Sequence, residues 1–355
     1  MGAQHPAEPA STLASFSKWI VAILLCFSPI LLLAQRNRPP VRVLPKTIII
    51  DTDAAGDDLM AIAFLLSRPD IRLEAITIVN GTAHVRPGGR NVLRLLELAG
   101  RRDIRVFLGR ETPASGDAEF PAEWRRIADQ LPGVVLPDAS RAPESQPAAE
   151  FLARRLSDAA HPVQVLALGP LTNLADSFSR ARGAARTVRQ IVMMGGAVRI
   201  PGNLGNGGAF KTQNTVAEWN IFADPSAAKA VFTSGASIRL VPLDATQRVP
   251  IPMSLLEQFV SQSKTPLARF VAQMLLANRD AIRQGIYFAW DPLAAVALVH
   301  PTVASFKPLS LEISDKPAEL GRTVEAPRRR ANAMVALDAD AEQFRTTFLG
   351  AFGIR

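Results

Sequence analysis

The feature that most constrains the fold is a continuous β-branched run that ends in a cluster of aspartates. Residues 47–50 read Thr-Ile-Ile-Ile, and an acidic loop follows at once. A strand with no alternation of polar and apolar residues is typical of a parallel sheet that is buried on both faces. Further apolar runs alternate with helical stretches, which is the βαβ rhythm. The sequence therefore predicts an α/β fold with a doubly wound, mostly parallel open sheet, whose ligands bind beyond the carboxyl ends of the strands.

The expected elements follow from apolar periodicity. Strands are expected at residues 47–50, 73–79, 163–168, 190–194 and 238–243. Helices are expected at residues 59–66, 91–99 and 148–157, with Asp57 or Asp58 placed to cap the first of them. The Pro- and Gly-rich stretches 111–140 and 201–213 are expected to be surface excursions that border a site.

The N-terminal part predicts export. Residues 19–33 are apolar, with Lys18 before them and Arg36 after them. This run is short for a membrane-spanning helix and contains Pro29, which favours a cleaved signal peptide over a retained anchor. We therefore expect residues 1–35 to be a signal peptide or N-terminal anchor, 36–45 a Pro- and Arg-rich spacer, and 46–355 the catalytic domain. The protein would be periplasmic or secreted, and it would contact a membrane only through an uncleaved N-terminal segment.

Charge and composition argue against nucleic acid as a partner. The chain carries 40 Lys and Arg against 32 Asp and Glu, a formal charge of +8, but apart from residues 328–330 the basic residues are scattered. With one Tyr and four Trp, the chain has few aromatic side chains on which bases could stack. Cys26 is the single cysteine, so neither an intramolecular disulfide nor a thiolate metal site is expected. The expected partner is a small molecule.

The acidic loop is the candidate site. Asp51, Asp53, Asp57 and Asp58 lie within eight residues, between the first strand and the first helix. Carboxylates crowded at a strand end repel one another unless a cation neutralises them, and a ligand set made only of oxygens favours Ca²⁺ or Mg²⁺ over zinc. The alternative is a solvated turn with a helix cap.

Five motifs carry a resemblance to a known family. The acidic loop, Asp-Thr-Asp-Ala-Ala-Gly-Asp-Asp, resembles the D-x-D-P-G-x-D-D signature of the inosine-uridine-preferring nucleoside hydrolases. The other motifs, in the family's order, are residues 168–173 (LGPLTN), 193–196 (MMGG), 216–220 (VAEWN) with Asp224-Pro225, and 291–295 (DPLAA). The resemblance implies a Rossmann-related nucleoside hydrolase fold. It also implies an N-glycosyl hydrolase of nucleoside catabolism that cleaves ribonucleosides to ribose and free base, as a homodimer or homotetramer.

The resemblance further implies a calcium site and a mechanism. Ca²⁺ would be bound by Asp53, Asp58, the backbone carbonyl of Thr172 and Asp291, and a metal-bound water would attack C1′. Asp53 would be the catalytic general base, and Asp51 would orient a metal ligand.

Substrate contacts are implied in the same way. The oxocarbenium-like transition state would be stabilised by nearby carboxylates. The residues expected to bind the ribose hydroxyls are Asp57, Asp291, Glu218, Asn220 and Asn203.

The sequence departs from the family pattern on the base side. Trp290 stands where many members have a histidine that protonates the leaving purine, so it is expected to stack on the base or to cap the pocket. His84 is the one histidine near the motifs that could replace that acid. Thr82, rather than Asn80, falls at the ribose-binding asparagine position, which leaves that contact open. Ala54 replaces a proline, which is expected to alter the stiffness of the loop.

Two other functions remain open on the sequence alone. A phosphatase of the haloacid dehalogenase type also begins with a strand and D-x-D, but the pair Asp57-Asp58 and the lack of that family's later motifs argue against it. The second is an exported nucleoside- or sugar-binding protein on the same fold, without catalysis.

Overall fold

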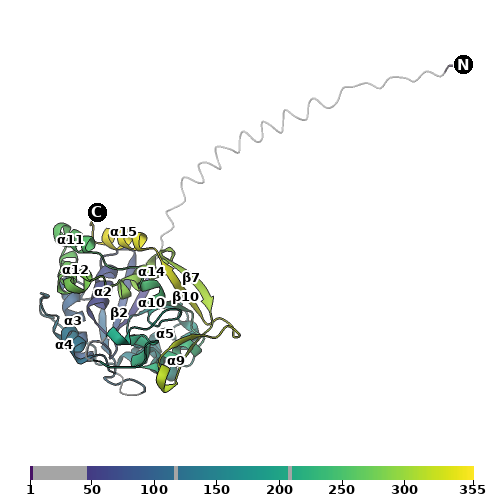
Figure 1. Ribbon diagram of the computed structural model, residues 1–355, viewed down its shortest axis with the longest axis horizontal. Coiled ribbons are helices and arrows are strands. Elements are labelled where there is room, and N and C mark those ends of the chain that lie inside the picture. The colour runs from purple at the N-terminus through teal and green to yellow at the C-terminus, as the bar shows by residue number, and fades with distance from the viewer. Residues whose placement is uncertain (3–45, 116–118, 207–209) are drawn as a thin grey trace. The chain divides into compact units, whose positions relative to one another are not determined.

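The computed structural model describes residues 1–2, 46–115, 119–206 and 210–355 (Figure 1). The chain divides into two units, Met1–Leu44 and Pro45–Arg355, and the second contains all the elements below. The expected signal or anchor and the spacer lie outside the described residues, apart from Met1 and Gly2. Among the helices described, none has both the length and the apolar character needed to span a bilayer.

The second unit is built on an eight-stranded sheet with the order β3-β2-β1-β4-β5-β6-β10-β7. All neighbouring strands are parallel except β10 and β7, which are antiparallel. The predicted doubly wound, mostly parallel sheet is therefore confirmed. The strands are β1 (Lys46–Thr52), β2 (Ile71–Ile78), β3 (Arg105–Leu108), β4 (Gln164–Ala167), β5 (Gln190–Met194), β6 (Ile238–Val241), β7 (Ala304–Leu309) and β10 (Ala333–Ala339), with a separate antiparallel pair β8 (Leu311–Ile313) and β9 (Thr323–Glu325).

Helices follow most of the strands. In the first half of the domain they are α2 (Gly56–Leu66), α3 (Val85–Leu98), α4 (Ala122–Gln130), α5 (Ala148–Leu156), α6 (Thr172–Arg180) and α7 (Ala184–Thr187). In the second half they are α8 (Trp219–Ala223), α9 (Pro225–Thr233), α10 (Leu243–Thr246), α11 (Met253–Gln262), α12 (Pro266–Ala277), α13 (Arg279–Arg283), α14 (Trp290–Val299) and α15 (Ala341–Ala351). Short 3₁₀ turns are η1 (Leu204–Asn206), η2 (Pro301–Val303) and η3 (Pro317–Glu319).

The sheet is buried on both faces, as the continuous apolar run of β1 predicts. Ile48 and Ile50 belong to a core that includes residues of α2, α12, α14 and α15, while Ile49 belongs to the core formed with α5, α6 and α9. Successive side chains of a strand point to opposite faces. The two helical layers therefore cover opposite faces of the sheet, and the carboxyl ends of the parallel strands meet at one edge.

Two local expectations are wrong, and a third holds only in part. Asp57 and Asp58 do not cap α2, because the helix starts at Gly56 and both lie inside its first turn, where they interact favourably with the helix dipole. Strand β6 stops at Val241, and Leu243 already begins α10. The expected surface excursion 111–140 contains the helix α4, which buries Arg125 and Ala128.

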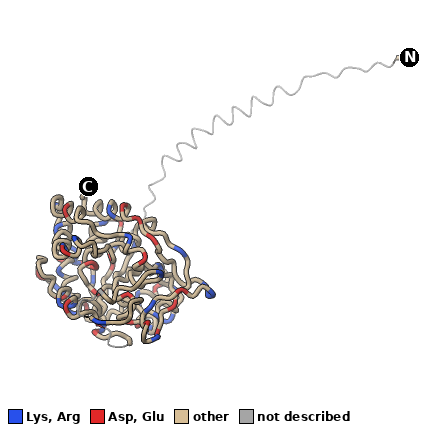
Figure 2. Tube along the Cα trace, in the orientation of Figure 1, with Lys and Arg blue, Asp and Glu red and all other residues tan. Residues whose placement is uncertain are grey.

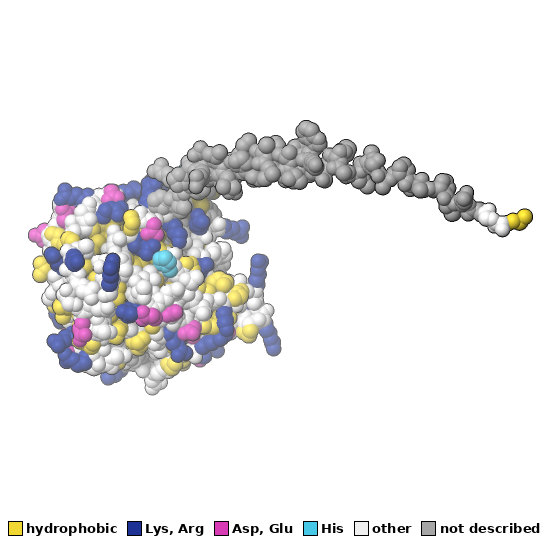
Figure 3. All heavy atoms as spheres, turned by 90° about the horizontal axis from the view of Figure 1, so that it is seen from above, with side chains coloured by type: hydrophobic (Ala, Val, Ile, Leu, Met, Phe, Trp, Pro, Cys, Tyr) yellow, Lys and Arg dark blue, Asp and Glu magenta, His cyan; other side chains and the backbone are white. Residues whose placement is uncertain are grey.

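Charged side chains are dispersed over the surface of the domain. In Figure 2, Lys and Arg positions and Asp and Glu positions are interspersed over the whole domain. On the face visible in Figure 3, the basic side chains lie apart from one another with acidic ones between them. This face carries no large basic patch.

Candidate active site

The candidate site lies at the carboxyl edge of the sheet, where loops after four strands meet. Asp53 follows β1, and the loop after β2 approaches it so closely that the Thr82 amide donates to Asp53 Oδ2 at 2.7 Å. A Cβ at Gly81 would lie 2.2 Å from the same oxygen. The loop after β4 is equally close, since a Cβ at Gly169 would lie 2.9 Å from Asp53 Cβ. Glycines at both positions allow three loops to converge on Asp53.

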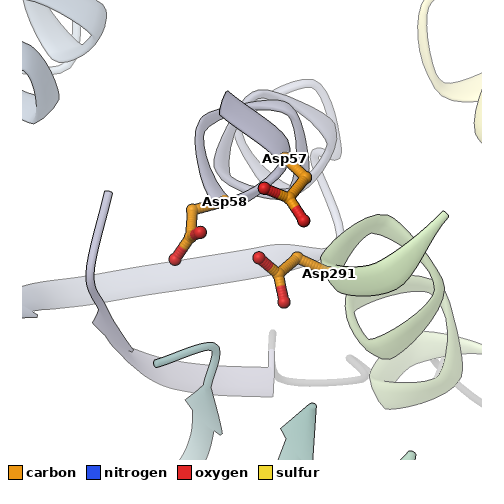
Figure 4. A group of neighbouring side chains, drawn as sticks. All are labelled: Asp57, Asp58 and Asp291. Atoms are coloured by element: carbon orange, nitrogen blue, oxygen red, sulfur yellow. The ribbon is translucent and has the colours of Figure 1, made fainter. Parts of the chain in front are cut away.

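A cluster of carboxylates lies next to Asp53. Asp57 and Asp58 come from the first turn of α2, and Asp291 comes from the first turn of α14 (Figure 4). One oxygen from each lies within 4.8 Å of the others, a spacing that a single metal ion can bridge. The expected metal set contained Asp53, Asp58 and Asp291, whereas the geometric group contains Asp57 in place of Asp53. The Thr52 hydroxyl donates to Asp58 Oδ1.

Among the described residues, no Lys, Arg or His forms an ion pair with these carboxylates. Burial and the charge of Asp53 raise the pKa of Asp57 to about 6. Burial and the neighbouring aspartates also raise the pKa values of Asp58 and Asp291 well above their usual range, and burial raises the pKa of Asp53. Asp291 Oδ1 is buried and has no hydrogen-bond partner among the described residues. The arrangement therefore favours a bound cation.

The opposite side of the site is formed by the segment around α8. Glu218 accepts hydrogen bonds from the amides of Asn220, Ile221 and Gly196, which hold its carboxylate in one orientation. Burial raises the pKa of Glu218 to about 7, and the charge of Asp53 adds to this effect. The side-chain Nδ2 of Asn220 donates to the Leu168 carbonyl at 3.0 Å, which connects this segment to the loop after β4. Glu218 therefore lies close enough to Asp53 to be affected by its charge, and Asn220 contacts the loop after β4.

Thr172 and Asn203 are placed by hydrogen bonds to the same region. Thr172 begins α6, and its hydroxyl donates to the buried Asp224 at 2.6 Å. Asp224 also caps α9 through the Ala227 amide. Asn203 Oδ1 accepts from the Trp219 amide at 3.2 Å, beside Glu218 and Asn220. These contacts fix both residues beside the segments of α6 and α8, and their expected roles in binding Ca²⁺ and ribose stay predictions.

Asp51 is fully buried beneath the site. Its Oδ1 accepts from the Thr77 hydroxyl at 2.6 Å and from the Asn173 amide nitrogen at 2.8 Å, while its Oδ2 has no partner among the described residues. Burial raises the pKa of Asp51 to about 7, against the effect of these two hydrogen bonds. Asp51 is thus fixed at the end of β1, two residues before Asp53.

The residues that depart from the family pattern near the expected nucleobase pocket take different positions. Thr82, and not Asn80, contacts Asp53, whereas the Asn80 side chain accepts from Arg125 at 2.7 Å. The His84 ring is 49% exposed and its Nδ1 lies 2.6 Å from Asp129 Oδ2, so it is engaged away from the carboxylate cluster. Trp290 opens α14 and packs edge-on against Tyr287 and Phe288.

Three residues of this region did not stand out in the sequence. Tyr287 is buried close enough to the cluster that Asp57, Asp291 and Asp58 add to the effect of burial, which raises its pKa well above the usual range. Its position four residues before Asp291 is a signal that could have identified it. Trp219 is buried inside the motif of residues 216–220, which was such a signal, whereas Arg125 is buried without one.

Comparisons with known proteins agree with the fold described above. The family model for inosine-uridine preferring nucleoside hydrolases matches residues 48–346. The chain is similar to uridine nucleosidase 1 of Arabidopsis thaliana, with 34% identity over 284 residues that cover 79% of this chain and 81% of the relative. Among solved structures it is similar to a plant nucleoside hydrolase, with a TM-score of 0.74, 28% identity, and coverage of 87% of this chain and 99% of that one. A purine-preferring ribonucleoside hydrolase from Gardnerella vaginalis gives a TM-score of 0.75 and 26% identity, with coverage of 86% and 98%.

Proposed function

The chain belongs to the inosine-uridine preferring nucleoside hydrolase family, and we propose that it hydrolyses the N-glycosidic bond of ribonucleosides with the help of a bound calcium ion. The observation that carries the proposal is the group of half-buried Asp57 with buried Asp58 and Asp291, beside buried Asp53, for which the described residues provide no ion-pair partner. Such a group is costly in an empty site and favourable around a cation.

The donor set fits calcium. Every donor is an oxygen, and calcium accepts carboxylates and backbone carbonyls in a flexible shell of six to eight ligands. Asp53, Asp58, Asp291 and the carbonyl of Thr172 would hold it, and the unpartnered Oδ1 of Asp291 supports this assignment. When bound, the ion would lower the pKa of a water molecule and so help to supply the nucleophile.

The chain's own residues account for the remaining work. Asp53 would accept the proton of the attacking water, held in place by the Thr82 amide at its Oδ2. Asp57, Asp291, Glu218, Asn220 and Asn203 would bind the ribose hydroxyls. Their carboxylates would also stabilise the positive charge that develops on the ribose as the bond to the base breaks. Asp51 lies two residues before Asp53 and accepts hydrogen bonds from Thr77 and Asn173. It would therefore fix the end of β1, which leads to the general base Asp53.

Trp290 and Thr82 would contribute to the base and ribose pockets. Trp290 begins α14, immediately before Asp291, so its ring is carried by the same helix end as the cluster. An aromatic ring in this position would cover the nucleobase. Thr82 is half-buried and replaces the expected asparagine, so its hydroxyl would take over a ribose contact.

The test is product release by the full-length protein from a panel of ribonucleosides. Free base and reducing sugar are measured with added Ca²⁺, after chelation, and for Asp53→Ala. We expect activity with Ca²⁺ and a large loss in the other two cases. A folded, calcium-loaded protein that binds ribosides without releasing base would instead support the binding-protein function.

The proposal also places the enzyme outside the cytoplasm. This inference rests on the apolar run of residues 19–33, which lies outside the described residues. N-terminal sequencing of protein from the periplasm or medium would test it, and a full-length protein that stays in the cytosol with Met1 intact would contradict it. The proposed homodimer or homotetramer is testable by light scattering.

A further inference from the structure

The side chain of Thr52 connects the end of β1 to the carboxylate cluster. Thr52 is the last residue of β1 and is fully buried. Its hydroxyl donates to Asp58 Oδ1 in the first turn of α2, and it accepts a hydrogen bond from the Ala54 amide at 3.0 Å. One uncharged side chain therefore joins the two ends of the acidic loop.

The number of protons on this hydroxyl fixes the direction of both hydrogen bonds. A threonine hydroxyl has one proton to donate and can accept two hydrogen bonds. The Ala54 amide can only donate, so the single proton of Thr52 is left for Asp58 Oδ1. Since a hydrogen bond depends on direction as well as on distance, this contact fixes the orientation of the Asp58 carboxylate.

Asp58 is the central member of the carboxylate cluster. One of its oxygens lies within 4.8 Å of ligand atoms of both Asp57 and Asp291. Burial raises the pKa of Asp58 well above its usual range, the charges of Asp53 and Asp57 add to this effect, and the Thr52 hydrogen bond acts against it. Carboxylates this close repel one another in the absence of a cation. The orientation of Asp58 therefore decides whether these oxygens can converge on one ion.

Thr52 is placed to control that orientation. Among the described residues, no other side chain outside the cluster donates a hydrogen bond to Asp57, Asp58 or Asp291. The second contact of the hydroxyl holds the donor itself in place. Ala54 has φ +56°, a conformation that costs alanine about 1–3 kcal/mol, and its amide is satisfied by Thr52. The turn that leads from β1 to α2 is therefore stabilised by the same hydroxyl that contacts Asp58.

We propose that Thr52 is a positioning residue of the metal site, whose hydroxyl holds the Asp58 carboxylate in the orientation that binds calcium. This inference rests on the proposed function. The hydroxyl does not bind the ion itself. It holds Asp58 in place before the ion arrives, so less conformational freedom is lost on binding. Hydrogen-bond partners of metal ligands contribute about 10–100-fold to metal affinity.

The test is a calorimetric calcium titration of the full-length protein after removal of bound metal. It compares the wild type with Thr52→Val, which has nearly the same shape without the hydroxyl, and with Thr52→Ser, which keeps the hydroxyl. We expect Thr52→Val to raise the Kd for Ca²⁺ about 10–100-fold. Thr52→Ser should stay close to the wild type, because a serine hydroxyl can make both hydrogen bonds.

Thermal unfolding separates a positioning role from a purely structural one. A loss of packing lowers Tm equally with and without Ca²⁺, because it acts on the folded protein in both conditions. A loss of calcium affinity reduces the rise in Tm that Ca²⁺ produces, because that rise depends on Kd. We expect this rise to shrink in Thr52→Val and to return in Thr52→Ser. The calcium concentration for half-maximal hydrolysis of uridine and of 4-nitrophenyl β-ribofuranoside should increase by the same factor as Kd.

Matched variants complete the experiment. Thr246→Val removes another fully buried hydroxyl, which has no hydrogen-bond partner among the described residues, and should leave Kd unchanged. If Thr52→Val does not fold, Thr52→Ala removes the same hydroxyl without placing a methyl group against Asp58 Oδ1, and it should also weaken calcium binding. An unchanged Kd in a folded variant without the hydroxyl, or an equal loss in Thr52→Ser, would overturn the proposal. A wild type that binds no calcium would contradict the proposed function itself.

Discussion

The substitution Gly81→Ala tests whether the close approach of the β2 loop sets the position of the general base. A Cβ at Gly81 would lie 2.2 Å from Asp53 Oδ2, far inside the 3.4 Å at which ordinary van der Waals contact begins. The loop and the Asp53 carboxylate must therefore separate by about 1 Å. Such a shift breaks or lengthens the 2.7 Å hydrogen bond from the Thr82 amide.

The magnitude follows from this displacement. A misplacement of about 1 Å can cost about 10²-fold in rate, because the reacting groups leave their productive geometry. Overpacking of a buried site costs about 1–3 kcal/mol of stability. We expect Gly81→Ala to lower kcat about 10²-fold while the protein still folds. Backbone strain adds nothing, since Gly81 does not have a positive φ.

The assay measures kcat for uridine and nitrophenyl riboside together with the urea midpoint. Gly350→Ala is the matched control, because a Cβ there meets no atom within 4 Å and the residue lies in α15. That control should keep full activity and gain up to about 1 kcal/mol of stability. Wild-type kcat in Gly81→Ala would refute the idea that this contact positions Asp53.

Three further outcomes are expected. Burial raises the pKa values of Asp51, Asp57 and Glu218 to about 7, 6 and 7, so without metal the free energy of unfolding should fall as pH rises from about 4 to 7. Ca²⁺ should therefore raise Tm more at pH 8 than at pH 5, whereas equal shifts would contradict this linkage. Ala54→Pro should lower the free energy of unfolding by more than about 1 kcal/mol, because Ala54 has φ +56° and its amide donates to Thr52. An unchanged urea midpoint would argue against that backbone. Asp224→Ala should weaken calcium binding in a titration, since Asp224 accepts a hydrogen bond from Thr172, an expected calcium ligand. An unaltered affinity would show that Asp224 does not position that ligand.

Most of the fold could be predicted because the central strands are buried on both faces. The run at β1 is apolar at each position from Ile48 to Ile50, and the structure places these residues in two different cores. The edge elements gave weaker signals. Strand β3 has four residues, and β10 pairs with β6 on one side and with the antiparallel β7 on the other, which no local pattern specifies.

The acidic half of the site was also predictable, for an electrostatic reason. Four aspartates within eight residues after a strand repel one another wherever the rest of the chain lies, so the sequence alone marks them as an unusual group. Their contact with Asp291 depends on the packing of α14 against α2, and only the order of the motifs indicated it. The left-handed backbone at Ala54 was not predictable, since alanine rarely adopts it and nothing in the sequence marks the strain.

The nucleobase side of the site could not be predicted from the sequence. Arg125 and Arg126 are adjacent and chemically identical, yet the first is 4% exposed at the site and the second is 50% exposed and paired with Glu123. Only the tertiary position of α4 distinguishes them. Overall similarity does not identify the preferred nucleobase either, because relatives named for uridine and for purines both resemble this chain. Base preference in this fold must therefore come from individual contacts, which depend on how segments far apart in the sequence pack together.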